Sequence, residues 1–181
     1  MRSSKFPWGF PWIMGKRRSK LRQANRLGKR AIQTCAMAFD HGIPYLLEFP
    51  EDLGSSRGHL PASIWQLSVV KSLAHHSKAH RIALYQKWFG TEYLKPTALL
   101  TTMALTKDFT LTGWPRFDGD GFYQGPLVYE EAPPMAMGPT NTVHTAAYPP
   151  ALNKALARMI VSSIFKNRFS STQPYPEGGF R

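Results

Sequence analysis

A short apolar run that stops at an acidic residue constrains the fold of this chain more than any other stretch. Residues 43–47 read Ile-Pro-Tyr-Leu-Leu, and Glu48 follows them directly. Gly42 precedes the run and Pro50 follows it, and five apolar or aromatic residues between such boundaries indicate a buried strand. Pro50 ends the predicted strand because proline has no N–H to donate to a neighbouring strand.

Glu48 is the first candidate for a functional side chain. We expect the strand at residues 43–47 to be internal and parallel to its neighbours. A carboxylate at the carboxyl end of such a strand lies where open α/β sheets bind their ligands. The alternative is that Glu48 only caps the following loop or pairs with a basic side chain, and the residue pattern taken alone favours that alternative.

The rest of the pattern predicts one α/β domain at residues 16–166, since 181 residues are enough for one domain. The expected sheet is small, with three or four strands, flanking helices and a long loop rich in Gly and Pro. The predicted helices are 16–40, 61–76 and 151–165, the further strands are 81–86, 98–103 and 109–112, the loop is 113–141, and the mobile tail is 167–181.

One edge of this sheet lacks a partner in the predicted order of elements. Nothing before residue 43 is expected to form a strand that could pair with the run at 43–47. An uncovered apolar edge promotes aggregation. We therefore expect either that a second chain covers this edge or that the natural protein is longer.

Basic charge is concentrated at the N-terminal end of the chain. The net charge is +12, and residues 1–39 contain no Asp or Glu. Such a segment binds polyanions through phosphate contacts and counterion release, although a solvated face that aids solubility explains it equally well. The candidates for nucleic-acid contacts here are Lys16, Arg17, Arg18, Lys20 and Arg22.

Aromatic residues precede this basic segment. Residues 1–15 contain Phe6-Pro7-Trp8 and Phe10-Pro11-Trp12. Prolines four positions apart exclude a helix, so we expect an extended arm. The four aromatic rings are available for base stacking.

The single cysteine, Cys35, excludes a disulfide framework and a cysteine metal site. It fits a reducing intracellular compartment, nuclear or cytoplasmic, and its place in an apolar helical stripe favours a core residue over a nucleophile. Residues 118–121 resemble a fragment of a calcium loop but lack the downstream Glu, so we predict no metal site. No run of about 18 apolar residues exists, so we expect no membrane span.

Several short motifs, taken in order, resemble a known family. They are Gly42 to Pro50 (GIPYLLEFP), Ser63-Ile-Trp65, Gln86-x-x-Phe89-Gly90, Lys95-Pro96-Thr97 and Thr145 to Leu152 (TAAYPPAL). Their order and spacing are similar to those of divergent cytosine C5 DNA methyltransferase-like proteins, including phage and mobile-element members. The resemblance covers residues 6–165 and implies the C-terminal part of a Rossmann-like methyltransferase sheet.

The resemblance also implies roles for individual residues. Glu48 matches the glutamate that holds the target cytosine at ring N3, which makes C6 electrophilic towards a cysteine nucleophile. The cytosine must first be flipped out of the duplex. Lys95 lies in the region of the basic motif that contacts the phosphate and the target base, and Pro149 and Pro150 shape the helix beside the S-adenosylmethionine site.

The chain departs from the family pattern at important places. Phe49 replaces the family asparagine after the glutamate, Ala146 replaces the asparagine of the closing motif, and Lys95-Pro96-Thr97 lacks the paired arginines. The glycine-rich cofactor loop and the Pro-Cys nucleophile motif would precede residue 1, and Cys35 cannot take the role of the nucleophile.

We therefore expect a truncated or split methyltransferase-like domain that is inactive alone. It would use S-adenosylmethionine only together with a second polypeptide. Two alternatives remain open: a non-enzymatic basic protein that binds nucleic acid through its first 39 residues, and the product of a decayed mobile element.

Overall fold

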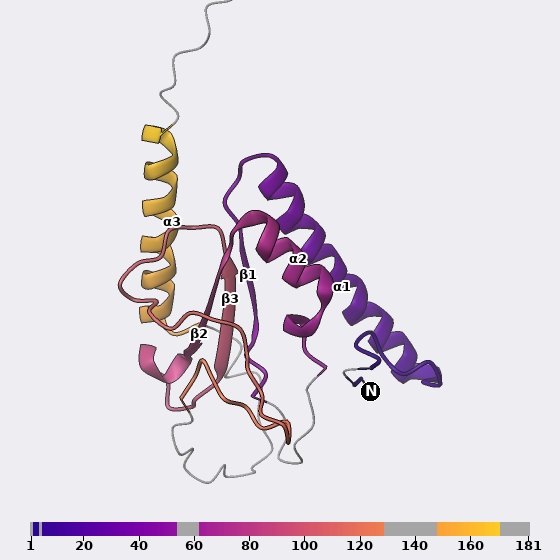
Figure 1. Cartoon of the computed structure of the whole chain (residues 1–181). Coiled ribbons are helices and arrows are strands. Elements are labelled where there is room, and N and C mark those ends of the chain that lie inside the picture. Colours follow the sequence, from indigo (N-terminus) through magenta and orange to yellow (C-terminus); the bar gives the residue numbers. More distant parts are fainter. Residues whose placement is uncertain (1, 4, 54–61, 129–147, 171–181) are drawn as a thin grey trace, which may run out of the picture.

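The computed structural model describes residues 2–3, 5–53, 62–128 and 148–170 (Figure 1). They form a mixed helix and strand structure with one small sheet, as the sequence predicts at that level. The elements in chain order are α1 (Gly15–Asp40), β1 (Leu46–Pro50), η1 (Ile64–Gln66), α2 (Ser68–Ser77), β2 (His80–Tyr85), η2 (Gln86–Phe89), β3 (Pro96–Thr101) and α3 (Pro150–Ser170), where η denotes a 3-10 helix.

The sheet has three strands in the order β1-β3-β2, and β3 is antiparallel to both of its neighbours. Consequently β1 and β2 run in the same direction, and the connection between them carries α2. Leu99 of β3 pairs with Glu48 on one side and with Ile82 on the other. The sheet thus contains a strand–helix–strand crossover, as α/β folds do, with an antiparallel strand inserted between the two parallel ones.

The prediction of an internal parallel strand at 43–47 is wrong. The strand begins at Leu46 and ends at Pro50, it lies at the edge of the sheet, and its one strand partner among the described residues is the antiparallel β3. Ile43 lies outside the strand and is 58% exposed. Pro50 fits at the end of an edge strand because its missing N–H is not needed there.

Helices cover the two faces of the sheet, giving three layers. Figure 1 shows α1 and α2 on one side of the sheet and α3 on the other. On the first side, Leu47 and Leu100 pack with Ile32 of α1, Val70 of α2 and the fully buried Trp65. On the second side, Leu99 and Ile82 pack with three residues of α3, namely Leu152, Ala155 and Met159. The sheet is therefore buried on both faces.

Helix α1 matches the predicted helix to within one residue. Leu21, Ile32 and Cys35 of the predicted apolar stripe are buried, whereas Leu27 is 62% exposed. Cys35 is a core residue as predicted, and burial raises the pKa of its thiol.

The N-terminal arm is not extended. Its backbone folds into turns, with Gly9 N–H donating to Phe6 O at 3.0 Å and Ile13 N–H donating to Phe10 O at 3.3 Å. Gly9 has φ +115°, and a Cβ built on it would lie 2.1 Å from Leu21 Cδ2. The arm therefore packs closely on α1. The prolines exclude a helix, but their fixed φ angle fits turns as well as an extended backbone.

Other predicted boundaries also shift. The predicted helix 61–76 is a 3-10 turn followed by α2, because Leu67 has extended backbone angles (ψ 130°). The predicted strand 109–112 makes a single bridge, Ile82 with Thr112. The predicted strands 81–86 and 98–103 are observed as β2 and β3, each beginning earlier. Helix α3 runs to Ser170, so residues 167–170 of the predicted tail are helical.

The described half of the long loop, residues 113–128, has its own structure. Phe117 and Tyr123 form a bridge. Asp118 Oδ1 accepts hydrogen bonds from the backbone N–H groups of Asp120 (3.0 Å) and Phe122 (2.8 Å), which is a turn stabilised by its own side chain. Residues 129–141 of the predicted loop, and the tail from residue 171, lie outside the described residues.

Candidate functional site

Glu48 lies on the face of the sheet that packs against α3. Its strand neighbour Leu46 contributes to the α3 core, while Leu47 contributes to the opposite core, and side chains alternate between faces along a strand. The Tyr148 hydroxyl donates a hydrogen bond to the Glu48 carboxylate. Tyr148 stands two residues before Pro150, the first residue of α3. The start of α3 is therefore joined to the middle of β1.

The electrostatic environment keeps Tyr148 protonated. Burial raises the pKa of its phenol most, and the negative charge of Glu48 and the hydrogen bond to it raise the pKa further. A phenol with a raised pKa remains a hydrogen-bond donor at neutral pH. One oxygen of Glu48 is thus held in place, and the carboxylate retains further lone pairs to accept other donors.

Lys95 belongs to the same cluster. Its Nζ lies 5.9 Å from the centroid of the Tyr148 ring, a distance at which the cation interacts favourably with the aromatic face. Lys95 directly precedes β3, and β3 pairs with β1. Three segments that are far apart in the sequence therefore meet here: the middle of β1, the start of β3 and the start of α3.

The backbone at Lys95 is unusual. Its φ is +35°, in the region that favours glycine. A proline follows it, and proline favours extended backbone in the residue before it. Gln86 N–H and the Thr97 hydroxyl both donate to the Lys95 carbonyl, at 3.3 and 3.2 Å. Such strained positions concentrate at binding sites, where surrounding contacts hold them.

The structure brings together some of the predicted site residues and separates others. Glu48, Lys95 and the Pro149-Pro150 step are gathered around Tyr148, with Pro149 buried and Pro150 exposed in the first turn of α3, where proline is favourable. The basic residues of α1 lie on the other side of the sheet (Figure 1). Those side chains are all exposed: Lys16, Arg17, Arg18, Lys20 and Arg22.

Three of the predicted stacking rings contact one another. Phe10 and Trp12 are stacked with centroids 4.8 Å apart, and Phe6 meets Trp12 edge-on at 5.6 Å. Trp8 points elsewhere, with Lys29 Nζ at 5.0 Å from its ring. Of the four rings, Trp12 is exposed (65%), whereas Phe6, Trp8 and Phe10 are half-buried.

Sequence reasoning missed Tyr148 as a site residue. It lies inside the TAAYPPAL motif, and its position directly before Pro149-Pro150 was the available signal. A tyrosine before a helix is usually a packing residue, so only the hydrogen bond to Glu48 marks it.

Sequence reasoning also missed a buried ion pair, Glu51 with Arg81. The Arg81 Nη2 donates to Glu51 Oε2, and Tyr123 Oη donates to Glu51 Oε1 at 2.7 Å. The guanidinium carbon lies 4.5 Å from the ring centroid of Trp65 and 5.5 Å from that of Trp114. Burial raises the pKa of Glu51, against the opposing charge of Arg81 and its hydrogen bonds, and burial lowers the pKa of Arg81.

This ion pair connects the long loop to the sheet. Arg81 Nη1 also donates to the Gly113 carbonyl at 2.8 Å, and the Tyr123 hydroxyl accepts from Leu127 N–H at 3.1 Å. Both side chains of the pair are at most 1% exposed. The pair is therefore enclosed by protein, which suits a structural role in holding residues 113–127 more than ligand binding.

In the described parts of the chain, no group of three or more His, Cys, Asp or Glu side chains is arranged to hold a metal ion. Among the described helices, none is long and apolar enough to cross a membrane. No protein-family model, curated protein sequence or solved structure matches this chain.

Proposed function

We propose that this chain is a methyltransferase-like domain that binds DNA and holds an unstacked cytosine at Glu48. The observation that carries the proposal is the meeting of Glu48, Tyr148 and Lys95, because the three belong to separate motifs of the resemblance and are far apart in the sequence. A carboxylate oriented by a phenol, with an ammonium group nearby, suits a base and its phosphate.

The chemistry of the cluster favours cytosine over thymine. A carboxylate accepts a hydrogen bond from the N4 amino group of cytosine, whereas thymine presents the O4 acceptor at that position. Lys95 supplies a positive charge for a phosphate oxygen. The base must leave the stack to reach Glu48, and the energy for this is smallest where the base is unpaired.

The Rossmann-like assignment belongs to this proposal. It is supported by β1 and β2, which run in the same direction on either side of β3 and are connected through α2. In the described structure β1 pairs with a strand on one side only. We infer that a second polypeptide, or further chain, adds strands at this edge and supplies the glycine-rich loop and the Pro-Cys nucleophile.

The resemblance assigns Pro149 and Pro150 to the shape of the helix beside S-adenosylmethionine. Pro149 is buried, and neither Pro149 nor Pro150 has a side-chain donor or acceptor for the cofactor. We therefore expect the cofactor to be bound chiefly by the second polypeptide, and no step of the proposed binding function depends on it.

The test compares two DNA duplexes that each carry one unpaired base opposite an abasic site, cytosine in one and thymine in the other. We expect the wild-type chain to bind the cytosine duplex about tenfold more tightly, within the range for one base contact of ~1–3 kcal/mol. Glu48→Gln should abolish most of this ratio, and Lys95→Met should weaken both duplexes equally. Fluorescence anisotropy measures both affinities.

Matched controls are available on the surface. Glu92→Gln and Lys107→Met change exposed residues of the same types and should leave both the ratio and the affinities unchanged. Equal affinity of the wild-type chain for the two duplexes, or an unchanged ratio in Glu48→Gln, would refute the assignment of Glu48.

A second candidate function is sequence-independent nucleic-acid binding by α1 without any base pocket. The observation that favours it is that the basic residues of α1 are exposed and that the helix contains no acidic residue before Asp40. This function predicts strong salt dependence with no preference between the two duplexes.

A further inference from the structure

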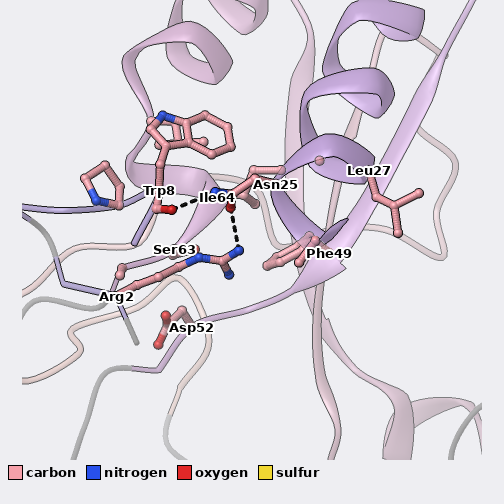
Figure 2. Close-up of a pocket in the computed structure, with 13 residues that line it drawn as sticks. Arg2, Trp8, Asn25, Leu27, Phe49, Asp52, Ser63 and Ile64 are labelled. Carbon is pink, nitrogen blue, oxygen red and sulfur yellow. Dashed lines mark hydrogen bonds between the residues drawn. The ribbon is translucent and has the colours of Figure 1, made fainter. Parts of the chain in front are cut away.

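A cavity of about 350 Å³ lies on the α1 side of the sheet, away from Glu48. Its walls come from the N-terminal arm, α1, the end of β1 and residues 62–67, and Figure 2 shows these segments converging on it. Small-molecule sites begin at about this size, ~300 Å³. The cavity is lined mainly by apolar and aromatic groups, including Trp8, Leu27, Phe49 and Ile64.

One polar group in this cavity has an unused donor. Arg2 Nη2 donates to Asn25 Oδ1 at 2.7 Å, and Asn25 Nδ2 donates to the Trp8 carbonyl at 2.6 Å, so the guanidinium is held in place. Arg2 Nε is buried and has no acceptor in the described part of the protein. Figure 2 shows the guanidinium of Arg2 extending between Asn25 and Phe49. A buried donor without an acceptor is costly, and a bound acceptor atom removes that cost.

A basic concavity on α1 adjoins this cavity. Its walls are Arg22, Asn25, Arg26, Lys29, Arg30 and Gln33, and Asn25 belongs to both. Lys29 also lies over the Trp8 ring, at 5.0 Å from its centroid. A polyanion lying along these cations therefore passes directly beside the mouth of the apolar cavity.

The aromatic ring best placed for a ligand is Phe49. It is 38% exposed, and it is supported from within the core by an edge-on contact with Trp65, with centroids 6.4 Å apart. A supported, partly exposed ring is a suitable platform for a planar group.

We propose that this cavity accommodates one base of a single-stranded nucleic acid whose phosphates lie along α1. Phosphates contact Arg22, Arg26 and Lys29, the base stacks on Phe49, and an acceptor on the base edge takes the free N–H of Arg2. The proposal rests on the nucleic-acid binding proposed above, and adds a second base site on the opposite side of the sheet from Glu48. Stacking of this kind accepts any base, because every base has a π face.

The test uses oligothymidylate and an abasic oligomer of equal length and equal charge. We expect the wild-type chain to bind oligothymidylate about tenfold more tightly, a ratio expected for one stacked base. Phe49→Leu should remove most of this ratio by lowering the affinity for oligothymidylate alone, and Phe49→Trp should retain it. Arg2→Met should reduce the ratio without altering the buried core. Fluorescence anisotropy gives the affinities, and thermal unfolding confirms that each variant is folded.

Phe122→Leu is the matched control, since Phe122 is an exposed phenylalanine outside the cavity, and its ratio should equal that of the wild-type chain. Photocrosslinking of an oligomer containing 5-iodouracil, mapped by mass spectrometry, should label the peptides that hold Trp8 or Phe49. The proposal is overturned if the wild-type chain binds both oligomers equally, which would mean binding of a polyanion only, or if Arg2→Met and Phe49→Leu both keep the wild-type ratio.

The test of the cavity is independent of the test of the Glu48 site. Phe49→Leu should leave the cytosine-to-thymine ratio measured with the abasic duplexes unchanged, and Glu48→Gln should leave the oligothymidylate-to-abasic ratio unchanged. If the wild-type chain shows neither the cytosine-to-thymine preference nor the oligothymidylate-to-abasic preference, both proposed base sites are refuted.

Discussion

Glu51 and Arg81 place two full charges in the interior, and many neighbours compensate them. Arg81 is bonded to Glu51 and to the Gly113 carbonyl and lies against two tryptophan rings, while Tyr123 donates to Glu51. The Arg81 Nε has no hydrogen-bond acceptor among the described residues. Desolvation of both charges is costly, so the pair is stable only while both members are present.

We expect removal of either member of this pair to destabilise the fold strongly. Glu51→Gln or Arg81→Met should each lower the free energy of unfolding by about 3–5 kcal/mol, because the remaining partner stays buried and uncompensated. The double variant Glu51→Leu with Arg81→Met should lose much less than the sum. Urea unfolding followed by tryptophan fluorescence measures these values.

Tyr123→Phe is the internal control for this prediction. It removes the hydrogen bond to Glu51 and the one accepted from Leu127 N–H, but no charge, so the expected loss is about 2 kcal/mol. Losses of similar size for Tyr123→Phe and for Arg81→Met would contradict the role assigned to the ion pair.

At the scale of elements, α1 combines core packing on one face with exposed positive charge on the other. Its buried residues, Leu21, Ile32 and Cys35, attach it to the arm and to the sheet, while the basic residues of its first half face solvent. The exposed cations can be replaced without opening the core. Their contribution to binding is therefore separable from stability.

Neutralising α1 should change the salt dependence of nucleic-acid binding. In a triple variant with Arg17, Arg18 and Arg22 replaced by Gln, the slope of log affinity against log salt should become less negative by about 2–3, since each phosphate contact contributes about 0.7–0.9. Anisotropy titrations at several salt concentrations provide the slope.

The matched triple variant replaces Lys71, Lys107 and Lys154 by Gln. These three residues are also exposed but lie outside α1, so the net charge falls equally while the α1 face is unchanged. A slope that changes by the same amount in both triple variants would mean that overall charge, and not α1, governs binding.

At the scale of the whole molecule, the arrangement of the described residues is a three-layer structure with one unpaired strand edge and two separate candidate sites. The Glu48 cluster and the α1 cavity lie on opposite faces of the sheet. Nothing in this sequence supplies a glycine-rich cofactor loop or a Pro-Cys nucleophile. Binding and methyl transfer are therefore expected to separate experimentally.

We predict that the purified chain binds DNA but transfers no methyl group to it. Calorimetric titration should detect no binding of S-adenosylmethionine to the isolated chain, and a radioactive methyl-transfer assay should give background counts. Methyl transfer by the isolated chain that is lost in Cys35→Ser would contradict both this prediction and the assignment of Cys35 to the core.

The class of the fold was predictable because the spacing of apolar residues differs between helices and strands. The apolar stripe at 16–40 predicted α1 to within one residue, and the apolar runs located β2 and β3. Strand direction was not predictable, since a continuous apolar run is typical of parallel strands, whereas this antiparallel sheet is also covered on both faces. For that reason β1 was placed inside a parallel sheet, although it lies at an antiparallel edge.

By itself the sequence determined the long helices α1 and α3 and the strands β2 and β3 to within a few residues, where the basic charge lies, and that Cys35 is a core residue, because these depend on local periodicity and composition. Only the tertiary structure decided that Tyr148 and Lys95 lie beside Glu48, that Arg81 reaches Glu51, and that the arm, α1 and β1 enclose a cavity. Each of these contacts joins residues far apart in the chain. Such pairings arise from how the layers pack, and no local pattern encodes them.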